Sequence, residues 1–229
     1  MGGYSRFVGK QVDLALSGNL IVKGEMIDAG LDLVVVRGIV SNHYYCVPSV
    51  HIRRIKEVDR KETPEKRESP EFVPTPDMPI AMEAGPISFR KLLMSAKGHF
   101  VQLYASGSQP VHGYMTHIMN DYFVFYSPAC KAMYVSMNHV KWLIPYEPDA
   151  TPYSLDNRYL PVNPSPAPLA RTFEEQCKKL MGQMVLLDGG GDEKIGLLES
   201  VADNRLGLVT ADRKKVFWNM AHIKTIQVP

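Results

Sequence analysis

The chain has 229 residues, a formal net charge of +2 at pH 7 and a hydrophobic fraction of 45%. These values are typical of one or two globular domains and give no overall electrostatic signature for nucleic acid. The three cysteines lie far apart and form no CxxC pair, which argues against a zinc site or a disulfide framework. No apolar run approaches the ~20 residues of a membrane span, and the N-terminus has no apolar signal core. A soluble intracellular protein is therefore expected.

An ordered set of residues occurs three times along the chain. A histidine, a β-branched apolar residue, a base, any residue and an apolar residue follow one another at 51–55, 139–143 and 222–226. Upstream of each histidine, a glycine precedes an Asp or Asn by eight positions. These pairs are Gly24 and Asp32, Gly113 and Asp121, and Gly196 and Asn204. The spacings predict three homologous units, at about residues 7–58, 97–146 and 181–228.

The first unit contains five short segments typical of strands. Residues 11–16 alternate between apolar and polar, as in a half-buried strand, and the SGN at 17–19 is typical of a turn. Gly24 lies inside the second segment, where it predicts a bulge or a sharp bend. PSVH at 48–51 is too short for an α-helix and predicts a single 3₁₀ turn. The strands are expected at residues 11–16, 20–28, 33–36, 43–47 and 52–55.

Each of the other two units repeats this pattern and is preceded by a short helix. Ser88 is the expected N-cap of a helix at 88–98. Thr172 and Glu175 have the spacing of a capping box, and Gly182 is expected to end the helix that they open. The strands are expected at 100–105, 111–118, 122–127, 132–135 and 140–144 in the second unit, and at 184–188, 194–201, 206–210, 215–218 and 223–228 in the third.

Five short strands in ~50 residues, with a bent second strand, predict a small closed barrel, because a small sheet hides its edges by curling on itself. The expected fold is therefore mainly β, with three tandem five-stranded small barrels, the second and third preceded by a short helix. Twelve of the seventeen prolines lie at 60–79 and 145–170, which are expected to be extended linkers. The first proteolytic cuts are expected between Glu62 and Gly85 or between Tyr146 and Arg171. The predicted domains are barrel 1 at 1–58, a linker at 59–86, helix and barrel 2 at 87–146, a linker at 147–170, and helix and barrel 3 at 171–229.

The order of these motifs resembles the Sm-like fold, in which a helix precedes five strands and a G-x-x-V pattern opens the first strand. Residues 8–36 and 44–55, VGKQVDLALSGNLIVKGEMIDAGLDLVVV and YYCVPSVHIRRI, are more closely similar to the short repeat of Bacillus-type spore coat proteins, including the N-terminal region of spore coat protein B. The resemblance implies a non-enzymatic structural protein that binds other spore coat proteins and has no membrane partner. It implies a location in the mother-cell cytoplasm and then in the spore coat. Because Sm-like units pair their fourth and fifth strands across neighbours, it also implies pseudo-trimeric packing or self-assembly.

The alternative function is RNA binding by an Sm-like protein with three barrels in one chain. The same fold occurs in the bacterial RNA chaperone Hfq, and residues 215–229 are distantly similar to its last strands. Hfq has a Lys-His pair there, whereas an uncharged residue precedes each repeated histidine here. Bases and aromatics at 214–218 (KKVFW) are typical of single-stranded nucleic-acid binding. Further bases that could contact phosphate are Arg53, Arg54, Lys56, Lys141 and Lys224. The overall charge balance makes nucleic acid the less favoured partner.

His51, His139 and His222 are open to two interpretations. Three imidazoles that converge on one axis could bind zinc, or each histidine caps the one-turn connector of its own unit. We favour the second interpretation, because one histidine per unit is what duplication produces. It predicts a buried hydrogen bond, worth about 1–3 kcal/mol at His222. No metal, cofactor or catalytic residue is expected, since no Ser, Cys or Asp lies in a nucleophile motif.

Three glycines complete the repeated signature. Gly24, Gly113 and Gly196 are each expected where the second strand bends and where a side chain would be crowded. The separate glycine-rich segment at 187–194 (LDGGGDEK) lacks the pattern of a phosphate-binding loop and is typical of a hairpin turn. Tyr153 and Tyr159, in the second linker, are the tyrosines best placed for exposed contacts.

Overall fold

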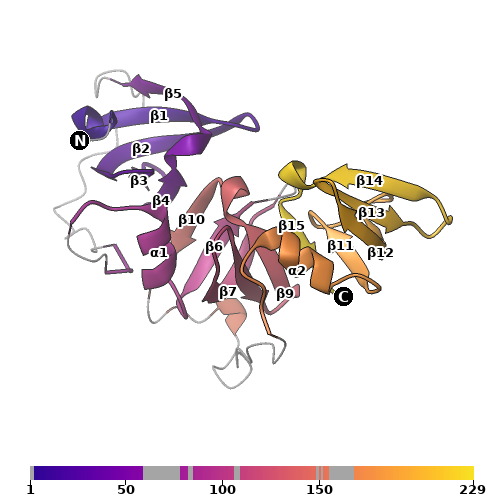
Figure 1. Cartoon of the computed structure of the whole chain (residues 1–229). Coiled ribbons are helices and arrows are strands. Elements are labelled where there is room, and N and C mark those ends of the chain that lie inside the picture. Colours follow the sequence, from indigo (N-terminus) through magenta and orange to yellow (C-terminus); the bar gives the residue numbers. More distant parts are fainter. Residues whose placement is uncertain are drawn as a thin grey trace. The chain divides into compact units, whose positions relative to one another are not determined.

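The computed structural model describes residues 3–58, 78–81, 85–105, 109–147, 150, 152–154 and 168–229. Within these ranges the chain is mainly β, as predicted, with fifteen strands and two α-helices (Figure 1). None of the described helices is long and apolar enough to cross a membrane. Most of the two predicted linkers, including Tyr159, lies outside the described residues.

The chain forms two compact units. The first consists of Met1–Ala96 and Lys141–Pro148, and the second consists of Lys97–Val140 and Asp149–Pro229. The helix and the fifth strand that we assigned to barrel 2 therefore group with the first unit. Separate folding of the three predicted domains stays a prediction.

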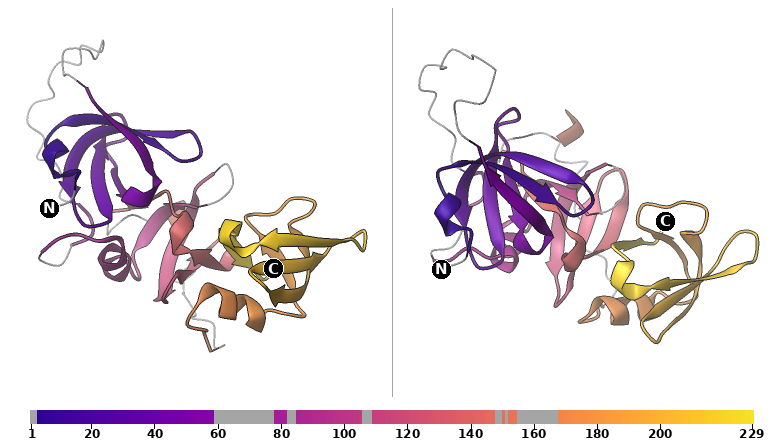
Figure 2. Two further views of the ribbon diagram at one scale, coloured as in Figure 1. Left: turned by 45° about the horizontal axis from the view of Figure 1, so that its top comes forward. Right: turned by 90° about the horizontal axis from the view of Figure 1, so that it is seen from above.

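The first unit contains one antiparallel sheet with the strand order β10-β4-β3-β2-β1-β5. The strands are β1 (Gln11–Leu16), β2 (Leu20–Ala29), β3 (Leu33–Gly38), β4 (Tyr44–Pro48), β5 (Ile52–Glu57) and β10 (Trp142–Pro145). The sheet is curled (Figure 2), and buried apolar residues of β1–β4 form one cluster. Val12, Leu14 and Leu16 of β1 are at most 1% exposed and alternate with half-buried residues, as the sequence pattern predicted. Burial of each such side chain contributes about 1.5–3 kcal/mol.

The second unit contains a longer antiparallel sheet, with the strand order β14-β13-β12-β11-β15-β9-β8-β7-β6. Its first four strands along the chain are β6 (Phe100–Tyr104), β7 (Val111–Ile118), β8 (Tyr122–Ser127) and β9 (Lys131–Ser136). The strands of the third repeat are β11 (Met184–Leu187), β12 (Ile195–Ala202), β13 (Arg205–Val209), β14 (Lys215–Asn219) and β15 (Thr225–Gln227). The second and third repeats therefore share one sheet.

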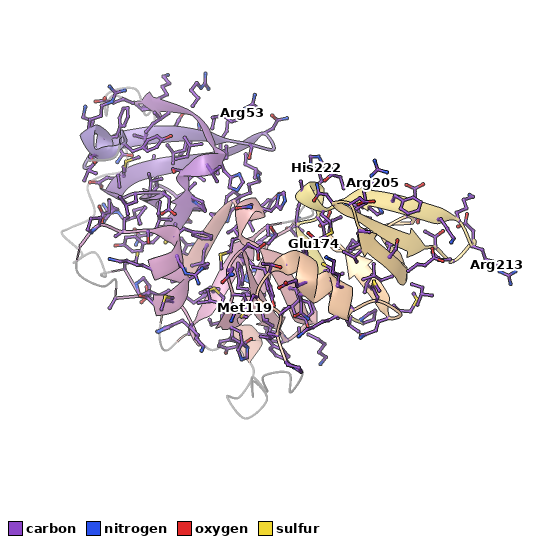
Figure 3. All side chains as sticks on the ribbon, in the orientation of Figure 1. Arg53, Met119, Glu174, Arg205, Arg213 and His222 are labelled. Atoms are coloured by element: carbon purple, nitrogen blue, oxygen red, sulfur yellow. The ribbon has the colours of Figure 1, made fainter. Side chains whose placement is uncertain are left out.

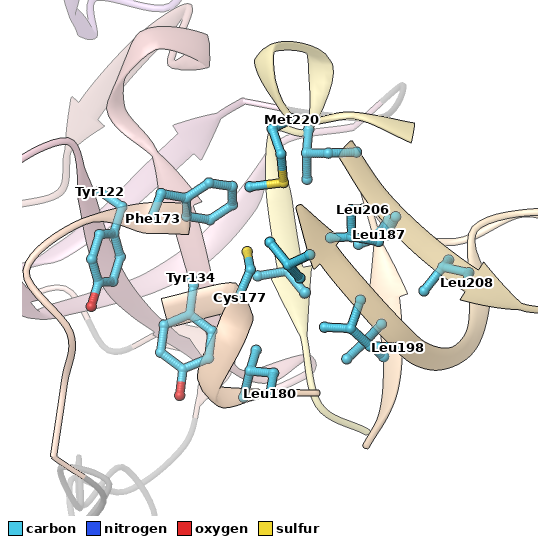
Figure 4. Packing of buried hydrophobic residues seen from close by; sticks show 14 of the residues in the cluster. Tyr122, Tyr134, Phe173, Cys177, Leu180, Leu187, Leu198, Leu206, Leu208 and Met220 are labelled. Atoms are coloured by element: carbon cyan, nitrogen blue, oxygen red, sulfur yellow. The ribbon is translucent and has the colours of Figure 1, made fainter. Parts of the chain in front are cut away.

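A single apolar cluster also joins these two repeats (Figure 4). Tyr122 and Tyr134, on β8 and β9, belong to the same cluster as Phe173 and Cys177 of the helix α2 (Phe173–Lys179). The rings of Tyr122 and Phe173 are 6.0 Å apart between centroids. The third repeat supplies most of the other residues of the cluster, among them Val185, Leu187, Leu198, Leu206, Leu208 and Ile226. Because the core is shared, the two repeats are expected to stabilise each other.

Both predicted helices are present and begin at the predicted caps. In α1 (Phe89–Ser95), Oγ of Ser88 accepts a hydrogen bond from the backbone nitrogen of Lys91 at 3.3 Å. In α2, Oγ1 of Thr172 accepts from the nitrogen of Glu175, also at 3.3 Å. Acidic residues open α2 and basic residues close it, which suits the helix dipole. The residues three positions beyond Ser95 and Lys179, Gly98 and Gly182, have φ of +80° and +81°, a conformation that favours glycine.

The sheets are open, so the expectation of closed barrels is not met. Among the described residues, β5 pairs with β1 but no pairing joins β5 to β4. The outer edge of β4 instead pairs with β10, and the outer edge of β9 pairs with β15. In both places the fourth strand of a repeat finds its partner in the fifth strand of the next repeat. This partner satisfies the edge that closure would otherwise have satisfied.

Candidate interaction surfaces

Each histidine of the repeated signature ends a one-turn connector of the predicted 3₁₀ type. The connectors are η2 (Ser49–His51), η4 (Met137–His139) and η7 (Met220–His222). The first residue of each connector donates a backbone hydrogen bond of 2.8–2.9 Å to the carbonyl oxygen of the repeated Asp or Asn. The pairs are Ser49 and Asp32, Met137 and Asp121, and Met220 and Asn204. This bond gives a structural reason for the nearly constant spacing between the two signature residues.

His51 lies in a small polar cluster and is only 7% exposed. Its Nδ1 is 3.1 Å from Oγ of Ser17 and 3.0 Å from Nζ of Lys141, which itself donates to Oγ of Ser17 at 2.6 Å. A lysine ammonium has donors only, so Nδ1 of His51 accepts from it and the ring proton is on Nε2. The cluster thus joins three segments: the connector through His51, the turn after β1 through Ser17, and the segment just before β10 through Lys141.

His139 and His222 have different surroundings, although they occupy the same position in their repeats. Nε2 of His139 is 3.0 Å from the carbonyl oxygen of Ala221, and this nitrogen carries the proton because a carbonyl only accepts. The bond joins η4 to η7 of the next repeat. His222 is exposed (Figure 3). The expected buried hydrogen bond within the same repeat is therefore wrong for His139, whose partner lies in the next repeat, and for His222, which faces solvent.

No described side chains form a cluster of three or more His, Cys, Asp or Glu that could hold a metal ion. At His51, Nδ1 already accepts from the Lys141 ammonium and has no lone pair left for a cation. Two of the three thiols are also unsuited to chemistry at neutral pH, because burial raises the pKa of Cys46 and of Cys177 to about 12.

The repeated glycines lie where two strands approach closely. Gly24, Gly113 and Gly196 pair with the valines at the start of the first strand, Val12, Val101 and Val185. A Cβ atom on Gly24 or Gly113 would overlap the carbonyl oxygen of the neighbouring strand, at Arg37 or Tyr126. The bulge itself lies three residues further on in each repeat, where the pairing of the second and third strands shifts. The extra residues there are Ile27, Thr116 and Glu199.

A contact that the sequence analysis missed holds α1 to the first repeat. Oδ1 of Asp32 accepts a 2.8 Å hydrogen bond from the backbone nitrogen of Phe89, the first residue of the helix. The neighbouring nitrogen of Leu31 donates to the carbonyl oxygen of Ile87 at 2.9 Å. We call this pair of bonds a helix clamp.

The second repeat has an equivalent helix clamp. Oδ1 of Asp121 accepts from the nitrogen of Phe173 at 2.8 Å, and the nitrogen of Asn120 donates to the carbonyl oxygen of Arg171 at 3.1 Å. In the third repeat the corresponding residue, Asn204, donates from its side chain to Oδ1 of Asn219 at 3.2 Å. The repeated acid thus binds the N-terminus of the helix that follows, whereas Asn204 bonds within its own repeat.

A second kind of contact, the strand junction, joins the fourth strand of one repeat to the fifth strand of the next. In the first junction Leu143 of β10 pairs with Cys46 of β4. The ring of Trp142 meets the ring of Tyr45 edge-on, with centroids 5.9 Å apart. In the second junction β15 pairs with β9 from Thr225 to Gln227, and Nε2 of Gln227 donates to the carbonyl oxygen of Cys130 at 2.6 Å.

Comparison with known proteins gives two matches. The sequence model of the YwrJ third domain matches residues 172–226, which extend from the start of α2 into β15. The Bacillus subtilis (strain 168) protein described as uncharacterized protein YwrJ is 38% identical over 230 residues, and the alignment covers 100% of both chains. The chain belongs to the YwrJ family. The match to a third domain coincides with the third predicted repeat.

In this member of the YwrJ family, β5 and β14 each have a pairing partner on one side only among the described residues. The fifth strand of the first repeat, β5, pairs with β1, and the fourth strand of the third repeat, β14, pairs with β13. Their counterparts inside the chain take part in strand junctions. The outer edges of β5 and β14 are therefore the candidate interaction surfaces, because unpaired strand edges present backbone donors and acceptors.

Proposed function

We propose that this protein is a non-enzymatic structural component of the bacterial spore coat that acts by binding other proteins through three Sm-like repeats. One observation carries the proposal: the helix clamp and the strand junction each occur twice in the chain. Both times, an incoming backbone segment is bound in the same way. A repeat of this kind is a receptor for a helix N-terminus and for a strand. Addition of a strand to a sheet edge is a common mode of protein recognition.

The spore-coat assignment is supported by the similarity of residues 8–36 and 44–55 to Bacillus-type coat repeats and by the Bacillus relative. RNA binding is the second candidate, and Phe217, which is 60% exposed on β14, is the residue that favours it. The bases around it are already paired, however. Nζ of Lys214 is 2.6 Å from Asp212, and Nζ of Lys215 is 2.8 Å from Glu199. These acids reduce the positive charge available to phosphate.

A fluorescent fusion of the full chain, produced in sporulating Bacillus subtilis, tests the proposal. A structural coat protein is expected to collect as a shell around the forespore and to remain with the purified spore. A signal that stays diffuse in the mother cell throughout sporulation would count against the coat assignment. A salt-dependent shift of the purified protein by single-stranded RNA at sub-micromolar concentration would favour the second candidate instead.

A further inference from the structure

The outer edge of β5 has the position at which the later repeats contact a neighbouring strand. In the third repeat the fifth strand pairs on both sides, with β11 and with β9. In the second repeat the fifth strand pairs with β4 of the first. In the first repeat β5 has a pairing partner only in β1, within the described part of the chain. The strand edge that pairs with a neighbouring strand in the second and third repeats is therefore also present in β5, where no described strand pairs with it.

A bulge in the pairing of β1 and β5 determines where the side chains at this edge point. Ala15 of β1 pairs with Arg54 and Leu16 pairs with Ile52, so Arg53 is the extra residue. Bulges redirect side chains, and here both arginines line the same open groove of about 400 Å³. The apolar part of the groove comes from the hairpin of β1 and β2 and includes Ile21, which is 59% exposed. Its remaining lining residues are Ala15, Leu16, Asn19 and Leu20.

The second repeat shows what residues at these two positions do when a neighbour is present. Counted from the repeated histidines, Arg53 and Arg54 correspond to Lys141 and Trp142. Nζ of Lys141 is 2.6 Å from Oγ of Ser17, and the ring of Trp142 packs edge-on against Tyr45. Both contacts hold the fifth strand against the preceding repeat. The two arginines are therefore interface positions, and charge complementarity determines which strand they suit.

A second copy of this chain is a poor match for β5. The free edge that a second copy could offer is β14, whose five residues, Lys215–Asn219, include no carboxylate. Facing Arg53, Arg54 and Lys56 of β5, it would supply no side-chain anion to these three cations. None of the residues that line the groove is aromatic. The groove therefore offers no ring on which the bases of single-stranded RNA would stack. A strand with carboxylates fits better, because guanidinium groups bind carboxylates with two parallel hydrogen bonds.

We propose that the outer edge of β5, with Arg53 and Arg54, binds an extended segment of another protein in which acidic and apolar residues alternate. The segment adds to the sheet as an antiparallel strand, with its carboxylates on the arginines and its apolar side chains on the opposite face, beside Ile52 and Ile55. This inference rests on the proposed function, since it names the surface through which a protein-binding module acts.

The test uses the full chain and three probes: a capped peptide of alternating Glu and Val, the same peptide with Lys in place of Glu, and a single-stranded oligouridine. The variant Arg53→Glu/Arg54→Glu reverses the charge of the edge. Arg205→Glu/Arg213→Glu makes the same change in charge on the third repeat and is the matched control (Figure 3). Binding is measured by titration calorimetry, and amide hydrogen exchange reports protection of β5. Circular dichroism checks that each variant is folded.

The acidic peptide is expected to bind the unmodified chain and the control variant alike, and to slow amide exchange in β5. Its affinity should fall at least about tenfold in Arg53→Glu/Arg54→Glu, since two charge-assisted contacts are replaced by repulsion. The lysine peptide should not bind. Equal binding of both peptides, unchanged affinity in the edge variant, or β5 amides that gain no protection would each overturn the proposal. If oligouridine competes with the acidic peptide, the proposal is overturned in favour of RNA. If the unmodified chain forms a dimer and the edge variant is a monomer, it is overturned in favour of a second copy.

The two proposals can fail separately. If the fluorescent fusion reaches the spore but the acidic peptide does not bind, only the strand-acceptor role of β5 is wrong. If the peptide binds as expected but the fusion stays diffuse, the acceptor is correct and the coat assignment is wrong.

Discussion

The carboxylate of Asp32 accepts a 2.8 Å hydrogen bond from the backbone nitrogen of Phe89, a residue 57 positions further along the chain. Asp121 binds Phe173 at the same distance across 52 positions. Phe89 and Phe173 begin α1 and α2, and the first N–H groups of a helix have no partner inside it. A carboxylate there satisfies an orphan donor and interacts favourably with the positive end of the helix dipole. Each clamp thus orders the helix that leads into the next repeat.

Asp121→Ala is expected to destabilise the second unit by about 1–2 kcal/mol, because the N–H of Phe173 loses a charged acceptor in a partly buried position. Amide exchange in α2 should accelerate correspondingly, by about 5–30-fold. Asp121→Asn keeps an acceptor oxygen and should lose less. Asn204→Gly, at the same position of the third repeat, is the control, because it removes the side chain without straining the φ of +58° there, and it should affect α2 less. Equal effects of Asp121→Ala and Asn204→Gly would show that the clamp contributes nothing.

The elements could be predicted from the sequence because their signals are local. The alternation at 11–16, the Ser88 and Thr172 caps and the one-turn connectors depend on neighbouring residues only. The helix clamps could not be predicted in this way. An Asp in a turn is ordinary in itself, and its partner lies more than fifty residues away. Closure was wrongly predicted for a related reason, since an edge can be satisfied equally well by its own repeat or by the next one.

The histidines show the same limit, because one sequence signature has three surroundings. His51 is 7% exposed and bonded within a polar cluster, whereas His222 faces solvent. What differs is the neighbouring chain: Lys141 and the strand that follows it reach His51, whereas His222 is exposed to solvent. Position within a repeat can be read from the sequence, but burial depends on what packs there.

The loss of stability on replacement by Ala is expected to follow the order His51, His139, His222. His51→Ala should cost about 1–3 kcal/mol, because it removes a buried hydrogen-bonding group and leaves a cavity beside Ser17. His222→Ala should stay within about 0.5 kcal/mol, as for most exposed substitutions. Hydrogen exchange monitored unit by unit measures these losses. Equal losses at all three sites would contradict the order, and stoichiometric zinc that each substitution removed would revive the metal interpretation.

A thiol reagent should distinguish the three cysteines. Burial raises the pKa of Cys46 and Cys177 to about 12, so at pH 8 only about one thiol in ten thousand is ionised at either position. Cys130 is partly exposed. The folded protein should therefore react rapidly at one thiol with a disulfide reagent, and at the other two only after unfolding. Cys130→Ser should abolish the rapid phase, and a rapid phase that survived this change would mean that β4 or α2 opens readily.

Gly113→Val should destabilise the second unit by roughly 1–3 kcal/mol, the usual cost of overpacking. Any side chain at this position meets the carbonyl oxygen of Tyr126 and the ring of Phe125, and a strand carbonyl cannot move aside without breaking the sheet. Gly3→Val is the matched control, because no atom lies within 4 Å of a Cβ added there. The loss is measured by hydrogen exchange across both units.

The extent of the loosening tests whether the repeats share a core. Tyr122 and Tyr134 of the second repeat pack in one cluster with α2 and the third repeat, and β9 pairs with β15. Gly113→Val should therefore accelerate exchange in β6–β9, in α2 and in β11–β15 together. The strands β1–β5 should keep their protection, because they belong to the other unit. Faster exchange confined to β6–β9 would mean that the second and third repeats unfold independently. Faster exchange in β1–β5 as well would mean that the two units unfold together.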